Sequence, residues 1–166
     1  RIGFELYNKI LTDVLSNKQG EVLAEEKEKA SVVFSGPAFI DEGYMPLVQD
    51  RLSFYQKISK VFAVDDLFEI KEEFLDRFGV FGKNIENLFL ITEIQCLLYS
   101  HPVSKCKIST SDVVFIFEEE REKIPTKSFL TAIREVAKNL GTPFKLSPNS
   151  TKSLKLSFKV KSLGLS

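Results

Sequence analysis

The sequence predicts an α+β fold: an N-terminal helical group followed by a small, mainly antiparallel sheet with one packed helix. Between residues 46 and 100, apolar side chains recur at spacings of three and four, the period of amphipathic helices. Residues 103–117 are instead rich in β-branched side chains, and residues 154–161 alternate strictly between apolar and polar. Because the helices come first and do not alternate with the strands, the pattern favours α+β over a βαβ fold.

Length and composition narrow the classes of protein that the chain can belong to. Its 166 residues suit one domain, and 43% apolar with 28% charged residues is ordinary for a soluble globular protein. Two cysteines exclude a disulfide scaffold, and no apolar run approaches the ~18 residues of a membrane span. Fifteen Phe and no Trp predict a core dominated by Phe.

The first 34 residues are expected to form a helix, a connector and a strand. Residues 1–16 place Phe4, Tyr7, Leu11 and Val14 on one helical face, and Gly20 closes this segment. The charge-rich residues 21–30 read as a solvated connector or a short helix, and residues 30–34 as a short strand. Since the helical pattern starts at the first residue, we expect the chain to be a piece of a longer polypeptide.

Three helices are predicted next. The first is opened by Pro46, which suits the first turn of a helix. The second is expected to begin at an N-terminal capping box formed by Asp66 and Glu69, and to end at Gly79. The third runs from about residue 83 to residue 100.

Strands dominate the remainder of the predicted fold. Residues 103–109 and 112–117 form a plausible hairpin, and a helix opened by Pro125 should end at Gly141. A short strand is expected at residues 144–146. The last strand, residues 154–161, carries Lys on its outer face, as edge strands often do.

The zero net charge conceals a polarity along the chain. Residues 1–102 hold eleven basic and seventeen acidic side chains, whereas residues 103–166 hold twelve basic and six acidic ones. Such asymmetry indicates a nucleic-acid surface, a surface complementary to a partner, or simply a bipolar domain. Lys155, Lys159 and Lys161 are the candidate phosphate contacts, although no aromatic side chain lies among them on the Lys face of the predicted strand.

No set of residues with catalytic, cofactor-binding or metal-binding spacing is found. His101 is the only histidine and lies at a predicted helix end, where a structural role is usual. Cys96 and Cys106 lack CxxC spacing, and with one histidine they make a poor zinc set. The acidic run at residues 118–120 is better explained as a solvated face than as a cation site. The motifs GxxxxGK[ST], GxGxxG and GxSxG are all missing.

The densest group of specific features lies in the helical part. The candidate interface or architecture residues are Asp50, Arg51, Tyr55, Asp76, Arg77, Phe78 and Gly79. An Asp near a helix C-terminus opposes the helix dipole, which suggests that a specific partner holds Asp76. The group is then either an internal arrangement that fixes the turn between two helices, or an exposed recognition corner.

An ordered set of short motifs resembles the C-terminal domain of bacterial transcription-repair coupling factor, the Mfd family. The set comprises Gly3–Tyr7, Tyr44-Met45-Pro46, Asp50–Tyr55 with Lys57-Ile58, and Leu67, Glu69-Ile70 and Asp76–Gly79. The resemblance covers about residues 1–100. Residues 101–166 match the family only in their strand–helix–strand pattern, so they are assigned to it by their position in the chain. The chain departs from the family at Leu47 and in the loop after Gly79, residues 80–83.

The resemblance implies a regulatory role inside a larger machine. The whole family protein is an ATP-driven translocase on double-stranded DNA that displaces stalled RNA polymerase and recruits UvrA for nucleotide-excision repair. ATP and Mg would belong to upstream modules, so this part would be non-catalytic and need no cofactor. Residues 1–20 would be a helix leaving the translocase module, and residues 21–166 a single regulatory unit.

The expected mechanism is autoinhibition. Residues 21–166 would form a clamp that masks the N-terminal UvrA-binding module of the same protein, in the bacterial cytoplasm and without membrane contact. The alternative is a DNA-contacting accessory domain that uses the Lys-rich C-terminal strand. A small enzyme of unknown type is disfavoured because the sequence offers no paired acid and base and no activated nucleophile.

Overall fold

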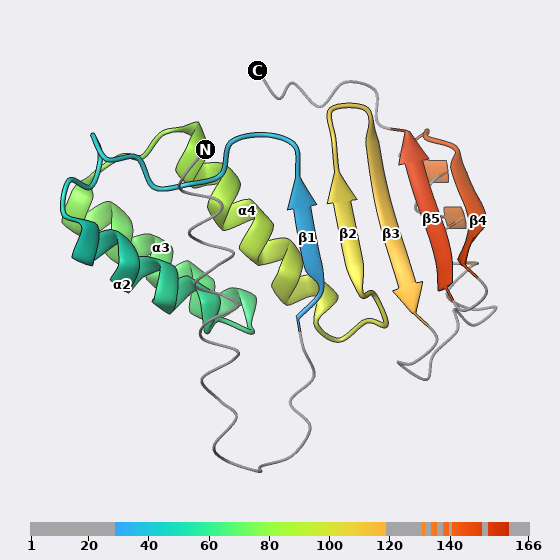
Figure 1. Ribbon diagram of the computed structural model, residues 1–166, viewed down its shortest axis with the longest axis horizontal. Coiled ribbons are helices and arrows are strands. Elements are labelled where there is room, and N and C mark those ends of the chain that lie inside the picture. Colours follow the sequence, from blue (N-terminus) through green and yellow to red (C-terminus); the bar gives the residue numbers. More distant parts are fainter. Residues whose placement is uncertain are drawn as a thin grey trace, which may run out of the picture. The chain divides into compact units, whose positions relative to one another are not determined.

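The computed structural model describes residues 29–118, 131, 134, 135, 138, 139, 141–150 and 153–159 (Figure 1). The described residues form two compact units. One unit is Pro37–Leu97, and the other combines Lys29–Gly36 with the described residues from Leu98 onward. The first unit is helical and the second contains a five-stranded mixed sheet, so the predicted α+β class is confirmed. The expected helix at residues 1–16 lies outside the described residues.

The helical unit is built from α2 (Val48–Ser59), α3 (Val64–Phe78) and α4 (Lys83–Leu98) (Figure 1). The predicted end of α3 is confirmed, since Gly79 has φ 79° and its N–H donates to the Leu75 carbonyl at 2.9 Å. Only glycine adopts such a left-handed backbone at little cost. Helix α2 begins two residues after Pro46, with Leu47 as its N-cap.

The predicted capping box of α3 is wrong. The N-cap is Ala63, in an extended conformation and without a side-chain cap, so Asp66 already lies within the helix. Asp65 and Asp66 occupy the first turn, where a negative charge favours the positive end of the helix dipole. The acidic residues therefore mark the start of α3 through their charge rather than through a capping hydrogen bond.

Phe74 of α3 lies at the centre of an aromatic core in the helical unit. Its side chain is fully buried. The ring packs edge-on against Phe54 of α2 at 4.5 Å and Phe89 of α4 at 5.4 Å between centroids, and it stacks on Tyr44 at 5.8 Å. Aromatic pairs in these geometries contribute beyond their buried area. The Phe-rich composition thus supplies a core that joins all three helices.

The sheet of the second unit has the order β1-β2-β3-β5-β4 (Figure 1). Its strands are β1 (Ser31–Phe34), β2 (Lys105–Ile108), β3 (Asp112–Glu118), β4 (Phe144–Ser150) and β5 (Ser153–Lys159). Strands β1 and β2 are parallel, and the other three pairs are antiparallel. The predicted β2–β3 hairpin and the mainly antiparallel character are therefore confirmed.

The position of the last strand corrects the sequence interpretation. Strand β5 pairs with β3 on one side and β4 on the other, so it lies inside the sheet. The lysines of β5, which suggested an edge strand, lie on a polar face of the sheet instead. The edge strand next to β5 is β4, which is longer than the predicted residues 144–146 and has a register irregularity between Pro148 and Ser150. Proline is tolerated at such an edge because it cannot donate to a sheet partner.

One face of the sheet carries the core of the second unit. That core contains the buried residues Ala30, Val103, Phe117 and Leu156, with the partly buried Leu98, Phe115, Phe144 and Phe158 packed against it. The predicted helix at 125–140 lies largely outside the described residues, although positions 131, 134, 135, 138 and 139 are helical. Lys161 and residues 119–123 also lie outside them.

Replacing Phe74 by Ala should lower the free energy of unfolding by about 3–5 kcal/mol, because it removes a buried ring that contacts all three helices. Urea unfolding followed by circular dichroism measures this loss. The matched control is Phe68→Ala on the same helix, since Phe68 is 61% exposed and should change stability by no more than about 0.5 kcal/mol. Equal effects of the two variants would contradict the assigned core.

The two cysteines should be unreactive in the folded chain. Both are buried free thiols, and burial raises the pKa of Cys106 to about 11. A thiol with that pKa is only about 0.1% thiolate at pH 8, and the thiolate is the reactive form. Titration with a disulfide reagent at pH 8 should therefore detect both thiols only after denaturation. A thiol in the native chain that reacts as fast as free cysteine would refute this.

Candidate functional site

Residues 37–47 form a loop that lies against the helices of the first unit, and most of the candidate residues converge on it. Ala38, Ile40 and Met45 of this loop are almost completely buried. A buried loop must satisfy the hydrogen-bonding capacity of its own backbone. Here α2 and α4 supply several of the required partners through their side chains.

Arg51, in the first turns of α2, holds the C-terminal end of the loop. Its Nη1 donates to the Met45 carbonyl at 2.6 Å and to the Pro46 carbonyl at 3.0 Å. Its Nη2 donates to the Glu42 carboxylate at 3.3 Å, but that side chain is 87% exposed and adds little. Arg51 itself is only 9% exposed, so the carbonyls supply the partners that a buried guanidinium needs.

Further side chains hold the rest of the loop. The buried Tyr55 hydroxyl accepts the Ile40 N–H at 2.9 Å, and burial raises the pKa of Tyr55. From α4, the Asn87 amide donates to the Pro37 carbonyl at 2.8 Å, and the Asn84 amide donates to the Asp41 carboxylate at 3.1 Å. Two helices therefore fix one loop at four separate points.

The loop in turn holds the C-terminal end of α3. The Tyr44 hydroxyl donates to the Gly79 carbonyl at 2.7 Å, while its ring lies nearly parallel to that of Phe74, with 8° between the planes. Phe78 packs against the Phe54 ring at 5.6 Å. Tyr55, Phe78 and Gly79 thus make contacts within the helical unit, as Arg51 does.

The outer side of the α2–α3 pair carries a charged cluster of Lys57, Glu73 and Arg77. Lys57 contacts the Glu73 carboxylate at 2.7 Å, and Arg77 contacts it at 2.9 Å. Hydrogen bonds first from Lys57 and then from Arg77 lower the pKa of Glu73, which favours its charged form. This contribution is present at neutral pH and is lost as the pH falls through the lowered pKa.

Asp76 is placed differently from the other candidates. Its side chain is exposed, and Arg77 pairs with Glu73 instead. Among the described residues, Asp76 has no hydrogen-bond or ion-pair partner, so the partner expected for it is not found there. Asp50 lies in the first turn of α2, where its charge suits the helix dipole.

Sequence reasoning missed several residues of this network. Asn84 and Asn87 were not singled out, although an amide in a largely apolar helix is a usable signal for a buried hydrogen bond. Glu73 could have been found from its i, i+4 spacing to Arg77. The sequence analysis names Tyr44 only as part of a family motif, because no local sequence feature predicts its hydrogen bond to the Gly79 carbonyl.

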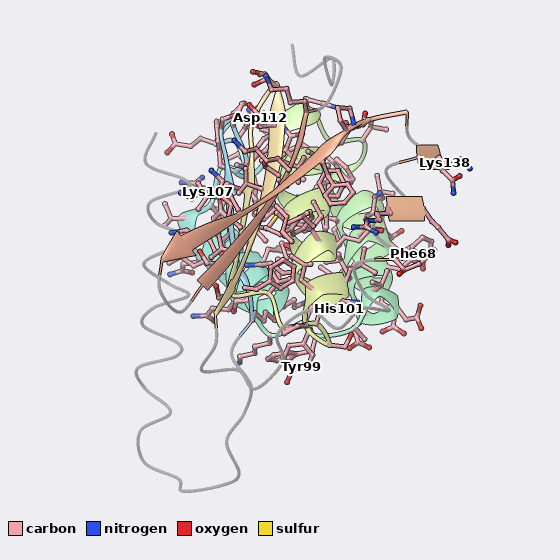
Figure 2. The ribbon with its side chains drawn as sticks, turned by 90° about the vertical axis from the view of Figure 1, so that its right-hand side faces the viewer. Phe68, Tyr99, His101, Lys107, Asp112 and Lys138 are labelled. Carbon is pink, nitrogen blue, oxygen red and sulfur yellow. The ribbon has the colours of Figure 1, made fainter. Side chains whose placement is uncertain are left out.

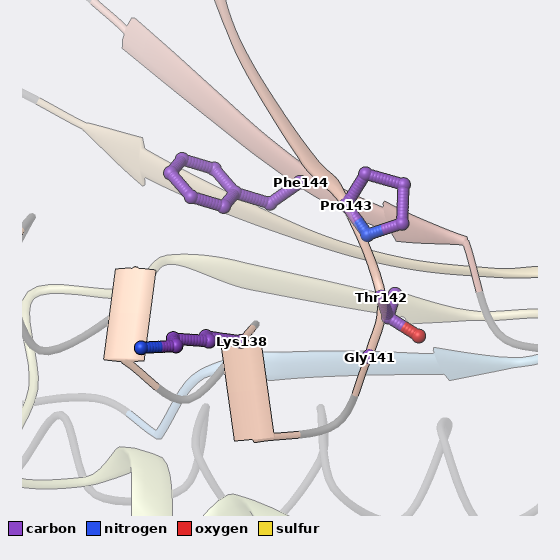
Figure 3. A pocket seen from close by; sticks show the side chains of 5 residues that line it. All are labelled: Lys138, Gly141, Thr142, Pro143 and Phe144. Atoms are coloured by element: carbon purple, nitrogen blue, oxygen red, sulfur yellow. The ribbon is translucent and has the colours of Figure 1, made fainter.

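The candidate phosphate contacts lie in the other unit. Lys155 and Lys159 are on β5, and Lys161 lies outside the described residues. A hollow of about 440 Å³ in this unit is lined by Lys138, Gly141, Thr142, Pro143 and Phe144 (Figure 3). Of these lining residues only Lys138 carries a charge, so they provide no acid–base pair.

The remaining chemistry-bearing residues do not gather into a site. His101 is exposed, while Cys96 and Cys106 are buried. Within the part of the chain that the structure describes, no group of three His, Cys, Asp or Glu side chains could hold a metal ion. The described helices also include none that is long and apolar enough to cross a membrane.

Comparisons with known proteins agree with the resemblance. The sequence matches the TRCF domain family over residues 34–128. It is 31% identical over 150 residues to a transcription-repair-coupling factor from Haemophilus influenzae, and 27% identical over 159 residues to one from Borreliella burgdorferi. These alignments cover 87% and 95% of this chain but only 13% and 14% of the relatives.

A relative from Bacillus subtilis with the same name is 24% identical over 119 residues, which is 72% of this chain and 10% of that protein. The chain therefore spans only about a tenth to a seventh of its relatives. The fold is similar to a crystal structure of the C-terminal domain of transcription-repair coupling factor, with a TM-score of 0.70, 17% identity and 84% of each chain covered. With more than half of its length matched by the family model, the chain belongs to the TRCF domain family.

Proposed function

We propose that this chain is a non-catalytic regulatory domain, and that it acts as an autoinhibitory clamp on the UvrA-binding module of its parent protein. The parent would be an ATP- and Mg-dependent translocase on double-stranded DNA that displaces stalled RNA polymerase and recruits UvrA in the bacterial cytoplasm. Residues 1–20 would connect the translocase module to residues 21–166. Two findings support this role. The chain belongs to the TRCF domain family, and it corresponds to only about a tenth of a related protein, as one domain of a larger protein would.

The observation that carries the proposal is an unsatisfied acidic surface on α3. Its members are exposed, follow helical spacing and have no ion pair among the described residues: Asp65, Glu69, Glu72 and Asp76. We call this group the acidic α3 face. Phe68 and Leu75 lie among these carboxylates and are 61% and 41% exposed. Exposed apolar side chains surrounded by charge are typical of a surface that binds another protein.

The acidic α3 face also rests on a rigid support. The Tyr44–Gly79 hydrogen bond and the Phe74 ring fix the C-terminal half of α3 before any partner binds. A preorganised surface loses less conformational entropy on docking. A partner surface rich in Arg and Lys would complete it, and such a polar contact can be released when the parent changes state.

Deleting residues 21–166 from the parent should increase its affinity for UvrA about 5- to 150-fold, the range of a regulatory coupling of 1–3 kcal/mol. Titration of purified UvrA against the intact and the truncated parent measures this change. A truncated parent that bound UvrA no better than the intact protein would rule out the clamp.

Reversing the charge of Asp76 should release the clamp without unfolding the domain. In the intact parent, Asp76→Lys places a positive charge where we expect a basic partner surface, so UvrA affinity should rise about tenfold. The matched control is Glu86→Lys, because Glu86 is an exposed carboxylate of the same unit that lies on α4. Equal effects of the two variants, or no effect of Asp76→Lys, would remove α3 from the interface.

Arg51 should behave as an architectural residue. Arg51→Met leaves the Met45 and Pro46 carbonyls without their donor and should lower the free energy of unfolding of the isolated chain by about 1–3 kcal/mol. Arg51→Lys should fall between it and the unaltered chain, because an ammonium cannot reproduce the guanidinium fork. Urea unfolding gives the ranking. If Arg51→Met were as stable as the unaltered chain and raised UvrA affinity in the parent, Arg51 would belong to the interface instead.

A further inference from the structure

Five lysines from three strands share one face of the sheet in the second unit. Lys105 of β2 and Lys155 of β5 lie opposite Ile116 from either side of β3. One row further along, Lys107 lies opposite Val114, and Val114 lies opposite Ser157, which is paired with Lys145 of β4. Lys159 follows on the same face of β5. We call this set the lysine face: Lys105, Lys107, Lys145, Lys155 and Lys159.

The lysine face points away from the core of its unit. Successive residues of a strand alternate between the two faces, and Phe115, Leu156 and Phe158 pack on the opposite one. Figure 2 shows Lys107 and Lys138 on opposite sides of the strands. The side chains of Lys107, Lys145 and Lys159 are exposed, whereas those of Lys105 and Lys155 are half-buried.

The burial of Ile116 fits this arrangement. It is only 8% exposed although it lies on the polar face. Its cross-strand neighbours are Lys105 and Lys155, whose aliphatic stems can cover an apolar side chain while the ammonium groups stay in water. The stems are thereby ordered, and the two charges are held at defined places on the sheet.

No carboxylate among the described residues forms an ion pair with these five lysines. Asp112 lies opposite Lys159 in the register, but its carboxylate accepts a hydrogen bond from the Ser111 hydroxyl at 2.6 Å. Like charges on one surface repel each other, and an anionic ligand would remove that cost. The lysine face therefore has the electrostatics of an anion-binding surface.

Its dimensions suit an extended polyanion better than a small ion. Lysines on β2 and β5 are two strands apart, about 10 Å, and residues two apart on one strand are separated by about 7 Å. The five charges are thus spread over a surface and do not converge on one point. A DNA duplex presents phosphates at about 3.4 Å of axial rise along each strand, so several can lie within reach of the long lysine side chains.

The other side chains on this face favour a duplex backbone over single strands. The other described positions on this face include Ser31, Val33, Asp112, Val114, Ile116, Ser147 and Ser157, and none of them is aromatic. Stacking platforms for single-stranded bases need aromatic rings. An acidic protein surface is also less suited, since lysine is depleted from protein–protein interfaces.

We propose that the lysine face binds the phosphate backbone of duplex DNA without sequence preference. The sequence points only to lysines at the C-terminal end, whereas the sheet register adds Lys105, Lys107 and Lys145 to Lys155 and Lys159. This inference does not rest on the proposed clamp, because the lysine face and the acidic α3 face share no residue and belong to different units. Lys is a point charge that suits nonspecific phosphate contacts, which give dissociation constants of about 10⁻⁴–10⁻⁶ M at physiological salt.

Fluorescence anisotropy of the 166-residue chain with a labelled duplex tests the proposal. A mixed-sequence duplex of about 30 base pairs should bind with a slope of log K against log salt near −4.5 if all five lysines contact phosphates, so affinity should fall about 500-fold between about 25 and 100 mM KCl. Lack of binding at the lower salt concentration would overturn the proposal.

A matched pair of variants separates the lysine face from general charge. Lys107→Gln/Lys155→Gln/Lys159→Gln should weaken binding at least about tenfold and reduce the salt slope by about three. Lys60→Gln/Lys83→Gln/Lys138→Gln changes the net charge equally at exposed positions off this face and should bind like the unaltered chain. Circular dichroism checks that both variants remain folded.

Three further outcomes would overturn the proposal. Equal losses in the two triple variants would mean that only net charge matters. Tighter binding to a single strand of equal length would exclude a duplex surface. Binding to poly-L-glutamate that depends on the same three lysines, with none to the duplex, would instead assign the lysine face to an acidic protein partner.

Discussion

The hydrogen bonds from the Arg51 guanidinium to the Met45 and Pro46 carbonyls are the constraint on which the helical unit depends. They attach the end of the 37–47 loop to α2, and the loop then carries Tyr44 to the Gly79 carbonyl at the end of α3. A guanidinium can be buried only where its donors find acceptors, so Arg51 specifies the position of the loop rather than merely tolerating it. The two most specific sequence motifs of this unit are therefore the two ends of one physical connection.

The aromatic core and these polar contacts have different roles. The rings around Phe74 bury apolar area from all three helices, and burial of apolar area favours folding. Apolar contacts alone tolerate many arrangements of similar volume. Arg51 and Asn87 donate hydrogen bonds to specific backbone carbonyls, and Tyr55 accepts one from a backbone N–H. These bonds exclude the alternative arrangements, because a shift would leave a buried polar group unpaired. One arrangement of the helix turn then remains, and it presents Asp76 at a fixed position.

Local sequence patterns were enough to locate the helices and strands. They did not reveal which strands pair or which side chains form long-range hydrogen bonds. Periodicity located α2–α4 and the β2–β3 hairpin, and Gly79 correctly marked the end of α3 because its requirement for a positive φ is local. The predicted start of α3 was wrong, because an Asp in the first turn and an Asp at the N-cap cannot be distinguished from the sequence alone. The place of β5 depends on pairing with β3 and β4, which its own alternation cannot reveal. The Tyr44–Gly79 bond spans 35 residues and needed the structure.

Two surfaces of opposite charge lie on separate units of a chain whose formal net charge is zero. The acidic α3 face belongs to the helical unit, and the lysine face belongs to the sheet. Exposed charges interact over roughly a Debye length, about 8 Å at physiological salt, so each surface acts mainly on what docks directly against it. The acidic α3 face would suit a basic protein surface and the lysine face an anionic polymer, although the overall charge of the chain favours neither.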